Sequence, residues 1–153
     1  MTDIHLSLES PVGPLTVTEQ NGALVSLEWN DRADNGVSPL LAETRRQLQA
    51  YFAGTLVTFD LPVAPVGTPH QQKVWRAMQK ISFGEYQSYG ELSAAIGSSP
   101  RSVGTACGRN PIPIIIPCHR VLAAGGQIGG YSGNGGTMTK RYLLSLEGVE
   151  LKE

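Results

Sequence analysis

Several features that would assign this chain to a specialised class are missing from it. No apolar run approaches the roughly 20 residues of a membrane-spanning helix, and the first residues lack the basic region and apolar stretch of a secretory signal. Two cysteines are too few for a disulfide framework. The composition, with 41% hydrophobic and 16% charged residues, is typical of a packed protein rather than a disordered one. We therefore expect a cytoplasmic protein in a reducing environment, with no membrane partner.

Metal ligands are also scarce. Besides the two cysteines, the chain contains three histidines, His5, His70 and His119. None of these residues has the spacing of a zinc site, in which ligands recur two to five residues apart. We therefore expect no metal ion.

Charge is distributed unevenly, although the formal net charge is only −1. Residues 1–68 contain three basic and eight acidic residues, a net charge of −5, whereas residues 69–153 contain nine basic and five acidic residues, a net charge of +4. A basic half joined to an acidic half is a sign of nucleic-acid contact by the basic half. An asymmetry of this size also arises by chance, so by itself it does not decide the matter.

The beginning of the chain has the pattern of a small antiparallel sheet. Apolar residues alternate with polar ones through residues 4–8 and again at residues 15–17. Asn21-Gly22 is a strong tight-turn signal, and another apolar segment follows at residues 24–27. These segments predict three short strands joined by turns.

One helix and a boundary follow this sheet. Ser38 and the proline after it are an N-cap and a first-turn residue, and the amphipathic pattern then runs to Phe52. Residues 55–67 contain one further candidate strand and lead into a proline-rich connection. This change of character predicts two domains, at residues 1–66 and 67–153.

The second part reads as a series of short helices. Thr68 and Ser88 each begin a capping box, and Ser99 precedes a proline at a first helical position. A three-residue turn containing glycine joins the helices that begin after Ser88 and Ser99, which predicts a helix-turn-helix. A last helix extends from about Thr137 to Glu147. The predicted fold is thus an α/β N-terminal domain, a small antiparallel sheet plus a helix, followed by a mainly α C-terminal domain.

The helix after Ser99 has two glycines on one face, Gly104 and Gly108. Each glycine costs about 1 kcal/mol relative to alanine in a helix interior, so this face is expected to meet a close neighbour. That neighbour is either the backbone of another helix in the core or a nucleic-acid groove too narrow for large side chains. We interpret Cys107, on the same helix, as a small buried hydrophobic residue.

Cys118 and His119 place a thiol beside an imidazole at the end of an apolar segment. Burial alone raises the pKa of a thiol and makes it inert, whereas a nearby histidine can act as its base. Neighbours in an extended chain point apart, so this pair would interact in a turn or through a water molecule. Glu147 is a candidate to orient the imidazole. From these residues alone, a structural cysteine and a nucleophilic cysteine both stay open.

Longer segments around these residues resemble a known family. Residues 109–121, Arg-Asn-Pro-Ile-Pro-Ile-Ile-Ile-Pro-Cys-His-Arg-Val, are similar to the active-site signature of the O6-alkylguanine-DNA alkyltransferases, the methylated-DNA–protein-cysteine methyltransferases. The resemblance covers about residues 69–149 and implies a winged helix-turn-helix domain preceded by an α/β domain. Further segments that resemble this family are residues 83–85, 88–92, 101–104, 130–133 and 146–148.

The resemblance implies a reaction and its catalytic residues. An alkyl group moves from O6 of guanine, or from O4 of thymine, in double-stranded DNA to Cys118, once per molecule and with no cofactor. His119, through a water molecule, and Glu147 would promote the thiolate, and Asn110 would brace the turn before the active-site segment. Tyr89 would help to rotate the nucleotide and assist the departure of guanine.

The resemblance also implies how DNA is bound. The helix-turn-helix would occupy the minor groove, and the damaged base would be flipped into a pocket while Arg101 fills the vacated stack. We expect the protein to act as a monomer. Val121, Tyr131 and Ser132 would frame the guanine. The residues implied to contact DNA are Tyr89, Arg101, Ser102, Gly104, Thr105, Gly108 and Arg109.

Two other functions are weighed against this one. Some relatives have tryptophan in place of Cys118 and sense damage without repairing it, so the cysteine here favours transfer. A Cys-His hydrolase or acyltransferase would need an oxyanion hole and would be indifferent to DNA. The predicted helix-turn-helix and Arg101 argue against that alternative.

Overall fold

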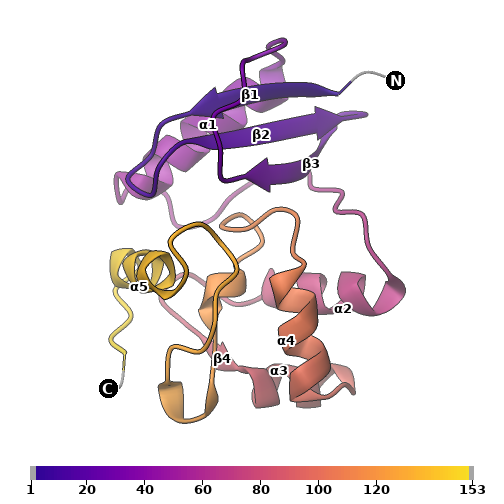
Figure 1. The fold of residues 1–153 in the computed structure, drawn as a ribbon, viewed down its shortest axis with the longest axis vertical. Coiled ribbons are helices and arrows are strands. Elements are labelled where there is room, and N and C mark those ends of the chain that lie inside the picture. The colour runs from indigo at the N-terminus through magenta and orange to yellow at the C-terminus, as the bar shows by residue number, and fades with distance from the viewer. Residues whose placement is uncertain (1–2, 152–153) are drawn as a thin grey trace. The chain divides into compact units, whose positions relative to one another are not determined.

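The computed structural model describes residues 3–151, which form two compact units that divide between Val66 and Gly67. The first unit consists of a three-stranded antiparallel sheet and one helix (Figure 1). Asn21 and Gly22 both adopt positive φ angles, 55° and 79°, as a tight two-residue hairpin requires. The strands, in their order across the sheet, are β1 (Ile4–Leu8), β2 (Leu15–Gln20) and β3 (Ala23–Glu28).

Helix α1 (Pro39–Phe52) packs against β1 and β2 and closes the core of the first unit. The hydroxyl of its N-cap, Ser38, accepts a hydrogen bond from the backbone N–H of Leu41 at 3.0 Å. The sheet and helix expected from the sequence are therefore confirmed. The buried side chains of this core are Leu6, Leu8, Leu15, Val17, Leu24, Leu27, Leu41, Leu48 and Tyr51.

The additional strand expected within residues 55–67 is reduced to one bridge. Val63 pairs with Leu24, through hydrogen bonds from Leu24 N to Pro62 O at 2.9 Å and from Ala64 N to Leu24 O at 2.8 Å. Proline has no backbone N–H and therefore cannot continue a ladder. Pro62 and Pro65 flank the bridge, so the pairing goes no further, and the candidate strand is present only as this single bridge.

The second unit is mainly helical, and β4 and β5 pair as a very short parallel ladder within it. Its elements in chain order are α2 (Pro69–Met78), β4 (Gln87–Ser88), α3 (Tyr89–Ile96), α4 (Pro100–Gly108), η1 (Cys118–Arg120), β5 (Val121–Leu122), η2 (Ala124–Gly126) and α5 (Thr137–Leu146).

The helix starts in this unit agree with the capping signals in the sequence. The hydroxyls of Thr68, Ser88 and Ser99 each accept a backbone N–H three residues later, at 3.0–3.1 Å. Gly97 ends α3 in the left-handed conformation with φ 69°, which glycine adopts at little steric cost. The short turn after it leads into α4, so the two helices form the expected helix-turn-helix.

Helix α2 supports α4 from the interior. Trp75 is 1% exposed, and its indole N–H donates to the carbonyl of Ala106 at 2.9 Å. Val74 and Met78 of α2 and Val103 of α4 are fully buried beside it. This packing holds one face of α4 in the core and leaves the opposite face available for the site described next.

Candidate active site

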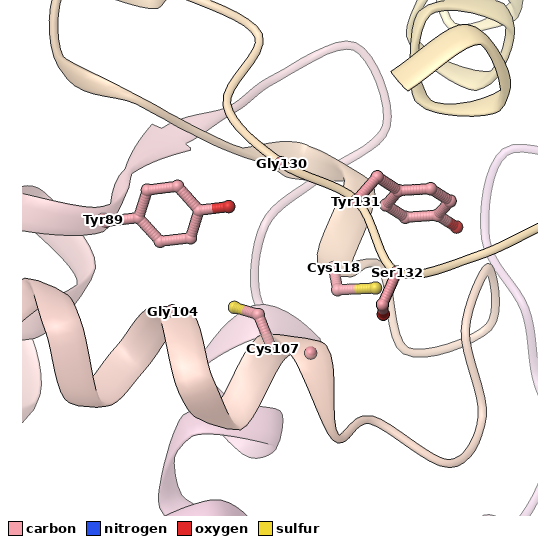
Figure 2. A pocket seen from close by; sticks show the side chains of 8 residues that line it. Tyr89, Gly104, Cys107, Cys118, Gly130, Tyr131 and Ser132 are labelled. Carbon is pink, nitrogen blue, oxygen red and sulfur yellow. The ribbon is translucent and has the colours of Figure 1, made fainter. Parts of the chain in front are cut away.

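Cys118 lies at the start of η1, and its side chain lines a pocket of about 280 Å³. Only 6% of the residue is exposed. In Figure 2 its sulfur lies on the side of Tyr131 and Ser132, across the pocket from Tyr89. The other lining residues are Gly104, Cys107, Gly108 and Gly130.

The segment that leads into Cys118 is held by Asn110. Its amide N–H donates to the carbonyl of Ile116 at 2.8 Å, and its side-chain oxygen accepts the N–H of Ile112 at 3.0 Å. Between these contacts Ile114 has φ 73°, a conformation that a β-branched residue rarely adopts. The two hydrogen bonds of Asn110 thus brace a strained turn directly before the thiol.

His119, Arg120 and Glu147 form a buried charged cluster next to Cys118. A carboxylate oxygen of Glu147 accepts from Nε2 of His119 at 2.7 Å. The Arg120 guanidinium donates to both oxygens of the same carboxylate, at 2.8 and 3.1 Å, and to the carbonyl of Ile81 at 2.6 Å. Because an ionised carboxylate only accepts hydrogen bonds, this contact assigns the imidazole proton to Nε2.

The other nitrogen of this imidazole, Nδ1 of His119, is buried and has no hydrogen-bond partner among residues 3–151. With the proton on Nε2, Nδ1 carries a lone pair and can accept a proton. The structure shows no direct hydrogen bond between the described atoms of His119 and the thiol of Cys118. A relay through a water molecule, as the resemblance implies, agrees with an orphaned acceptor in this position.

Burial controls the titration of the groups in this site. It raises the pKa of the Cys118 thiol, while hydrogen bonding with Asn110 and the positive charge of Lys140 offset part of that rise. Burial lowers the pKa of His119, and the Glu147 carboxylate counteracts it. Burial thus favours the uncharged forms of both groups, the thiol of Cys118 and the neutral imidazole of His119.

The second cysteine in the pocket has a different environment. The sulfur of Cys107 contacts the sulfur of Met78 at 3.5 Å, and burial raises the pKa of the Cys107 thiol to about 12. A thiol that holds its proton so firmly is a poor nucleophile. Cys107 is buried as the sequence suggested, although it also forms part of the pocket wall.

The glycine face of α4 is open rather than packed against another helix. A Cβ atom added at Gly104 would meet only the ring of Tyr89, at 4.0 Å, and one added at Gly108 would meet no described atom within 4 Å. The alternative of a close helix neighbour in the core is therefore excluded. Both glycines instead border the pocket that contains Cys118.

The remaining predicted DNA contacts lie on the outside of α4 or at its end. Arg101, Ser102, Thr105 and Arg109 are all exposed. Ser102 and Thr105 direct their hydroxyls to neighbours on the helix itself, Ser99 and the carbonyl of Arg101. Within residues 3–151, the exposed side chain of Arg101 forms no hydrogen bond or ion pair.

The predicted substrate residues come from three segments. Tyr89 is at the first position of α3, and burial raises the pKa of its phenol to about 12. Tyr131 and Ser132 belong to the glycine-rich loop before α5, and burial raises the pKa of Tyr131 well above its ordinary value. Val121 is buried in β5, directly after η1.

Sequence reasoning missed Lys140. Its side chain is fully buried, and Nζ donates to the carbonyls of Val121 at 2.7 Å and Gly130 at 3.0 Å. Burial lowers the pKa of this amine to about 8. A signal was present, because Lys140 precedes Leu143 and Leu144 by three and four residues and therefore lies on the apolar face of the last helix.

Within residues 3–151, no group of three or more His, Cys, Asp or Glu side chains is arranged to hold a metal ion. No helix in this range has the length and apolar character needed to cross a membrane.

Comparison with known proteins identifies both units. Residues 5–65 match the family model of the ribonuclease-like domain, and residues 69–149 that of the DNA-binding domain, of 6-O-methylguanine DNA methyltransferase. The constitutive methylated-DNA–protein-cysteine methyltransferase of Bacillus subtilis is 40% identical, with 97% of this chain and 98% of that protein covered. The counterpart from Methanosarcina acetivorans is 41% identical, over 92% of this chain and 95% of its own.

Solved structures agree with this match. The crystal structure of Mycobacterium tuberculosis OGT in complex with DNA superposes with a TM-score of 0.84 at 42% identity, over 94% of this chain and 91% of that chain. An O6-methylguanine DNA methyltransferase from Methanococcus jannaschii reaches 0.67 at 26% identity, over 97% and 96%.

Proposed function

The chain belongs to the family of methylated-DNA–protein-cysteine methyltransferases, and we propose that Cys118 is the cysteine to which it transfers the alkyl group. The protein is a methyltransferase that repairs alkylated DNA directly, by moving the alkyl group from the DNA to one of its own cysteines. The observation that carries the assignment is the pocket of about 280 Å³, which the Cys118 side chain and the open glycine face of α4 line together.

The chemistry is a displacement at the alkyl carbon. The sulfur of Cys118, as a thiolate, forms a bond to the methyl carbon while the bond from that carbon to O6 of guanine breaks. The electron pair of the broken bond goes to guanine, which takes up one proton in exchange for the one that the thiol released. The same displacement applies at O4 of thymine. The product is a stable thioether, so each protein molecule acts once.

His119 and Glu147 generate the thiolate in this proposal. Nδ1 of His119 accepts the thiol proton through a bridging water molecule, and the Glu147 carboxylate stabilises the imidazolium that results. A resting thiol with a raised pKa makes such a base necessary. Asn110 contributes by holding the turn that presents the sulfur.

Tyr89 and the loop after β5 receive the guanine. A phenol with a pKa of about 12 keeps its proton at neutral pH and can donate it toward the departing base. The backbone of Val121 and the side chains of Tyr131 and Ser132 frame the ring. The open wall beside Gly104 leaves room for a base flipped out of the duplex.

DNA binding is assigned to α4. Its exposed side chains, Arg101, Ser102 and Thr105, with Arg109 at its end, contact the minor groove, and Arg101 fills the space that the flipped nucleotide leaves. Gly104 and Gly108 let the helix backbone approach the groove. The net charge of +4 on residues 69–153 supports this assignment.

The two units have different tasks in this proposal. The first unit, with its net charge of −5 over residues 1–68, supports the fold and takes no part in the chemistry. The second unit binds DNA and contains the reacting groups. We further propose that the protein acts as a monomer, because the acceptor and its base come from one chain. We also propose a cytoplasmic location, with which the two free cysteines agree.

Mass spectrometry of the intact protein tests the acceptor. Incubation with one equivalent of a duplex that contains O6-methylguanine is expected to add ~14 Da, the mass of one CH₂ group, to the wild-type protein. Peptide mapping should locate the added mass at Cys118, and Cys118→Ser should gain nothing while still binding the duplex.

Cys107→Ser is the matched control, because it removes the other thiol of the same pocket and should leave the mass gain intact. A gain in Cys118→Ser, or its loss in Cys107→Ser, would identify Cys107 as the acceptor. Binding of the lesion by wild-type protein without any gain would instead indicate a damage sensor.

A further inference from the structure

The pocket contains a second thiol that the proposed alkyl transfer does not use. Cys107 of α4 lines the same pocket of about 280 Å³ as Cys118, and both cysteines are free. In Figure 2 the sulfur of Cys107 lies on the side of Tyr89 and that of Cys118 on the side of Ser132. Two thiols can be joined by oxidation only where the fold brings them together, and this pocket does so.

The backbone ties both cysteines to one residue, Asn110. The N–H of Asn110 donates to the carbonyl of Cys107 at 3.3 Å. Its side-chain amide donates to the carbonyl of Ile116 at 2.8 Å, and the same carbonyl accepts the N–H of Cys118, also at 2.8 Å. The chain between the two cysteines therefore folds back on itself, and the end of α4 is linked to the start of η1 through Asn110.

The contact that holds the sulfur of Cys107 is weak. Its Sγ donates to Sδ of Met78 at 3.5 Å. A thiol is a weak donor and a thioether a weak acceptor, so little is lost when the side chain of Cys107 turns about its Cα–Cβ bond. Cys118 follows the turn that Asn110 braces, so Cys107 is the side chain that moves.

We propose that hydrogen peroxide converts Cys107 and Cys118 into a reversible intramolecular disulfide. The thiolate of Cys118 attacks the peroxide, takes one oxygen as a sulfenic acid, and releases the other oxygen as water. The sulfur of Cys107 then attacks the sulfur of Cys118, and the S–O bond breaks. The hydroxyl group leaves as a second water molecule with the proton of Cys107. The two thiols lose two electrons, which the peroxide takes up.

Both steps are compatible with the surroundings of the thiols. A pocket that admits a guanine base also admits a peroxide molecule, and Nδ1 of His119 is free to accept the proton of Cys118. A pKa of about 12 leaves only about one Cys107 thiol in 10⁵ ionised at pH 7. Groups held in one site react as if at about 10⁵–10⁸ M, which offsets this factor. The charge of Cys118, which contributes to that pKa, is also lost when the sulfenic acid forms.

The disulfide withdraws Cys118 from repair and protects it at the same time. A sulfur in a disulfide has no thiolate to receive a methyl group. A sulfenic acid without a second thiol is oxidised further to sulfinic and sulfonic acids, which thiols do not reduce, whereas a disulfide is reduced by thiol exchange. This consequence for repair rests on the proposed function of Cys118, but formation of the disulfide does not.

Mass spectrometry without reductant tests the disulfide. Wild-type protein is treated with hydrogen peroxide, and N-ethylmaleimide then blocks every remaining thiol. We expect a product that is lighter by about 2 Da, the mass of the two hydrogens lost, and that takes up no maleimide. Trypsin cleaves after Arg101, Arg109 and Arg120, so the cysteines fall into separate peptides, residues 102–109 and 110–120. The disulfide should join these peptides, and dithiothreitol should separate them and restore methyl transfer.

Cys107→Ser is the matched control, and Cys107→Ala replaces it if circular dichroism shows the serine variant to be unfolded. Either variant should accept a methyl group before oxidation as the wild type does. After peroxide treatment, Cys118 of the variant should progress to sulfinic acid, and dithiothreitol should not restore methyl transfer.

The proposal would be overturned by wild-type protein in which Cys118 progresses to sulfinic acid as in the variants, or in which the disulfide joins two molecules. Joined peptides in a protein that takes no methyl group from DNA even before oxidation would support the disulfide and overturn the proposed function instead.

Discussion

Replacement of Glu147 by glutamine changes one atom in the centre of the buried charged cluster. The carboxylate accepts hydrogen bonds from His119 at 2.7 Å and from Arg120 at 2.8 and 3.1 Å. A glutamine keeps one acceptor oxygen, which can still receive a hydrogen bond from Arg120. Its amide N–H₂ group would then face Nε2 of His119, where the wild-type protein has an acceptor.

This exchange changes the tautomer of the His119 imidazole. Because the amide donates to Nε2, the proton of His119 moves to Nδ1, the nitrogen that has no partner in the described structure. Nδ1 then no longer accepts the thiol proton. A positioned general base contributes about 10²- to 10⁴-fold to a rate, so we expect transfer to Glu147→Gln to slow by that factor, or roughly 3–5 kcal/mol of activation free energy.

Stability falls as well, because Arg120 is left buried without a charged partner. Removing one partner of a buried ion pair costs about 3–5 kcal/mol, a large part of the about 5–15 kcal/mol that stabilises a typical protein of this kind. The rate of methyl transfer therefore has to be measured by quenched mass spectrometry at a temperature where urea titration shows the variant to be folded. Glu150→Gln, an exposed glutamate just after α5, is the matched control.

Folded Glu147→Gln protein that accepts the methyl group within about threefold of the wild-type rate would contradict this prediction, because so small a loss of rate is well below the contribution of a general base. Such a result would mean that His119 is not the base, or that its tautomer does not depend on the carboxylate.

Three further predictions concern helix α4 and the buried imidazole of His119. Gly104→Ala should raise the free energy of unfolding by up to about 1 kcal/mol, since its Cβ fits at 4.0 Å from Tyr89. Gly104→Leu should instead fill the pocket and slow transfer without unfolding the protein. Urea titration measures the stability and mass gain measures the transfer, and equal transfer by the two variants would contradict the idea that Gly104 leaves room for the flipped base. Arg101→Ala should lose most of its transfer rate on duplex DNA and least on free alkylguanine, because flipping a base costs a few kcal/mol. Equal losses on both substrates would disprove that Arg101 fills the space left by the flipped nucleotide. Because burial lowers the pKa of His119 below its ordinary value of 6.5, the unfolded chain binds a proton at this residue before the folded chain does as the pH falls. The free energy of unfolding should therefore decrease as the pH drops below about 6.5. Urea titrations should show a smaller decrease in His119→Gln, and the same dependence of unfolding free energy on pH in both proteins would exclude this cause.

The sequence alone determined the elements whose signals are local. Thr68, Ser88 and Ser99 cap their helices as expected, because a hydroxyl reaches an N–H only three residues away. The Asn21-Gly22 turn follows from the preference of these two residues for positive φ. The candidate strand within residues 55–67 failed, since pairing depends on a partner elsewhere and prolines removed its donors.

The same limit applies to the site. Cys118 and His119 could be singled out because they are adjacent, and Glu147 was a candidate partner by composition that the resemblance then supported. His119 and Glu147 are 28 positions apart in the chain, and no local pattern indicates that their side chains meet at 2.7 Å. The contact with Glu147 decided which nitrogen of His119 is left free, and the packing of α4 placed the sulfur of Cys107 against Met78.

Only the tertiary structure decided the choice left open for Gly104 and the surroundings of the Lys140 ammonium. A glycine pattern is the same whether the helix face meets another helix or an open pocket, and the packing of α4 on Trp75 turned that face outward. A lysine on an apolar face says nothing of what its ammonium contacts. Local preferences are set within a few residues of chain, whereas the environment of a charge is set by segments that only folding brings together.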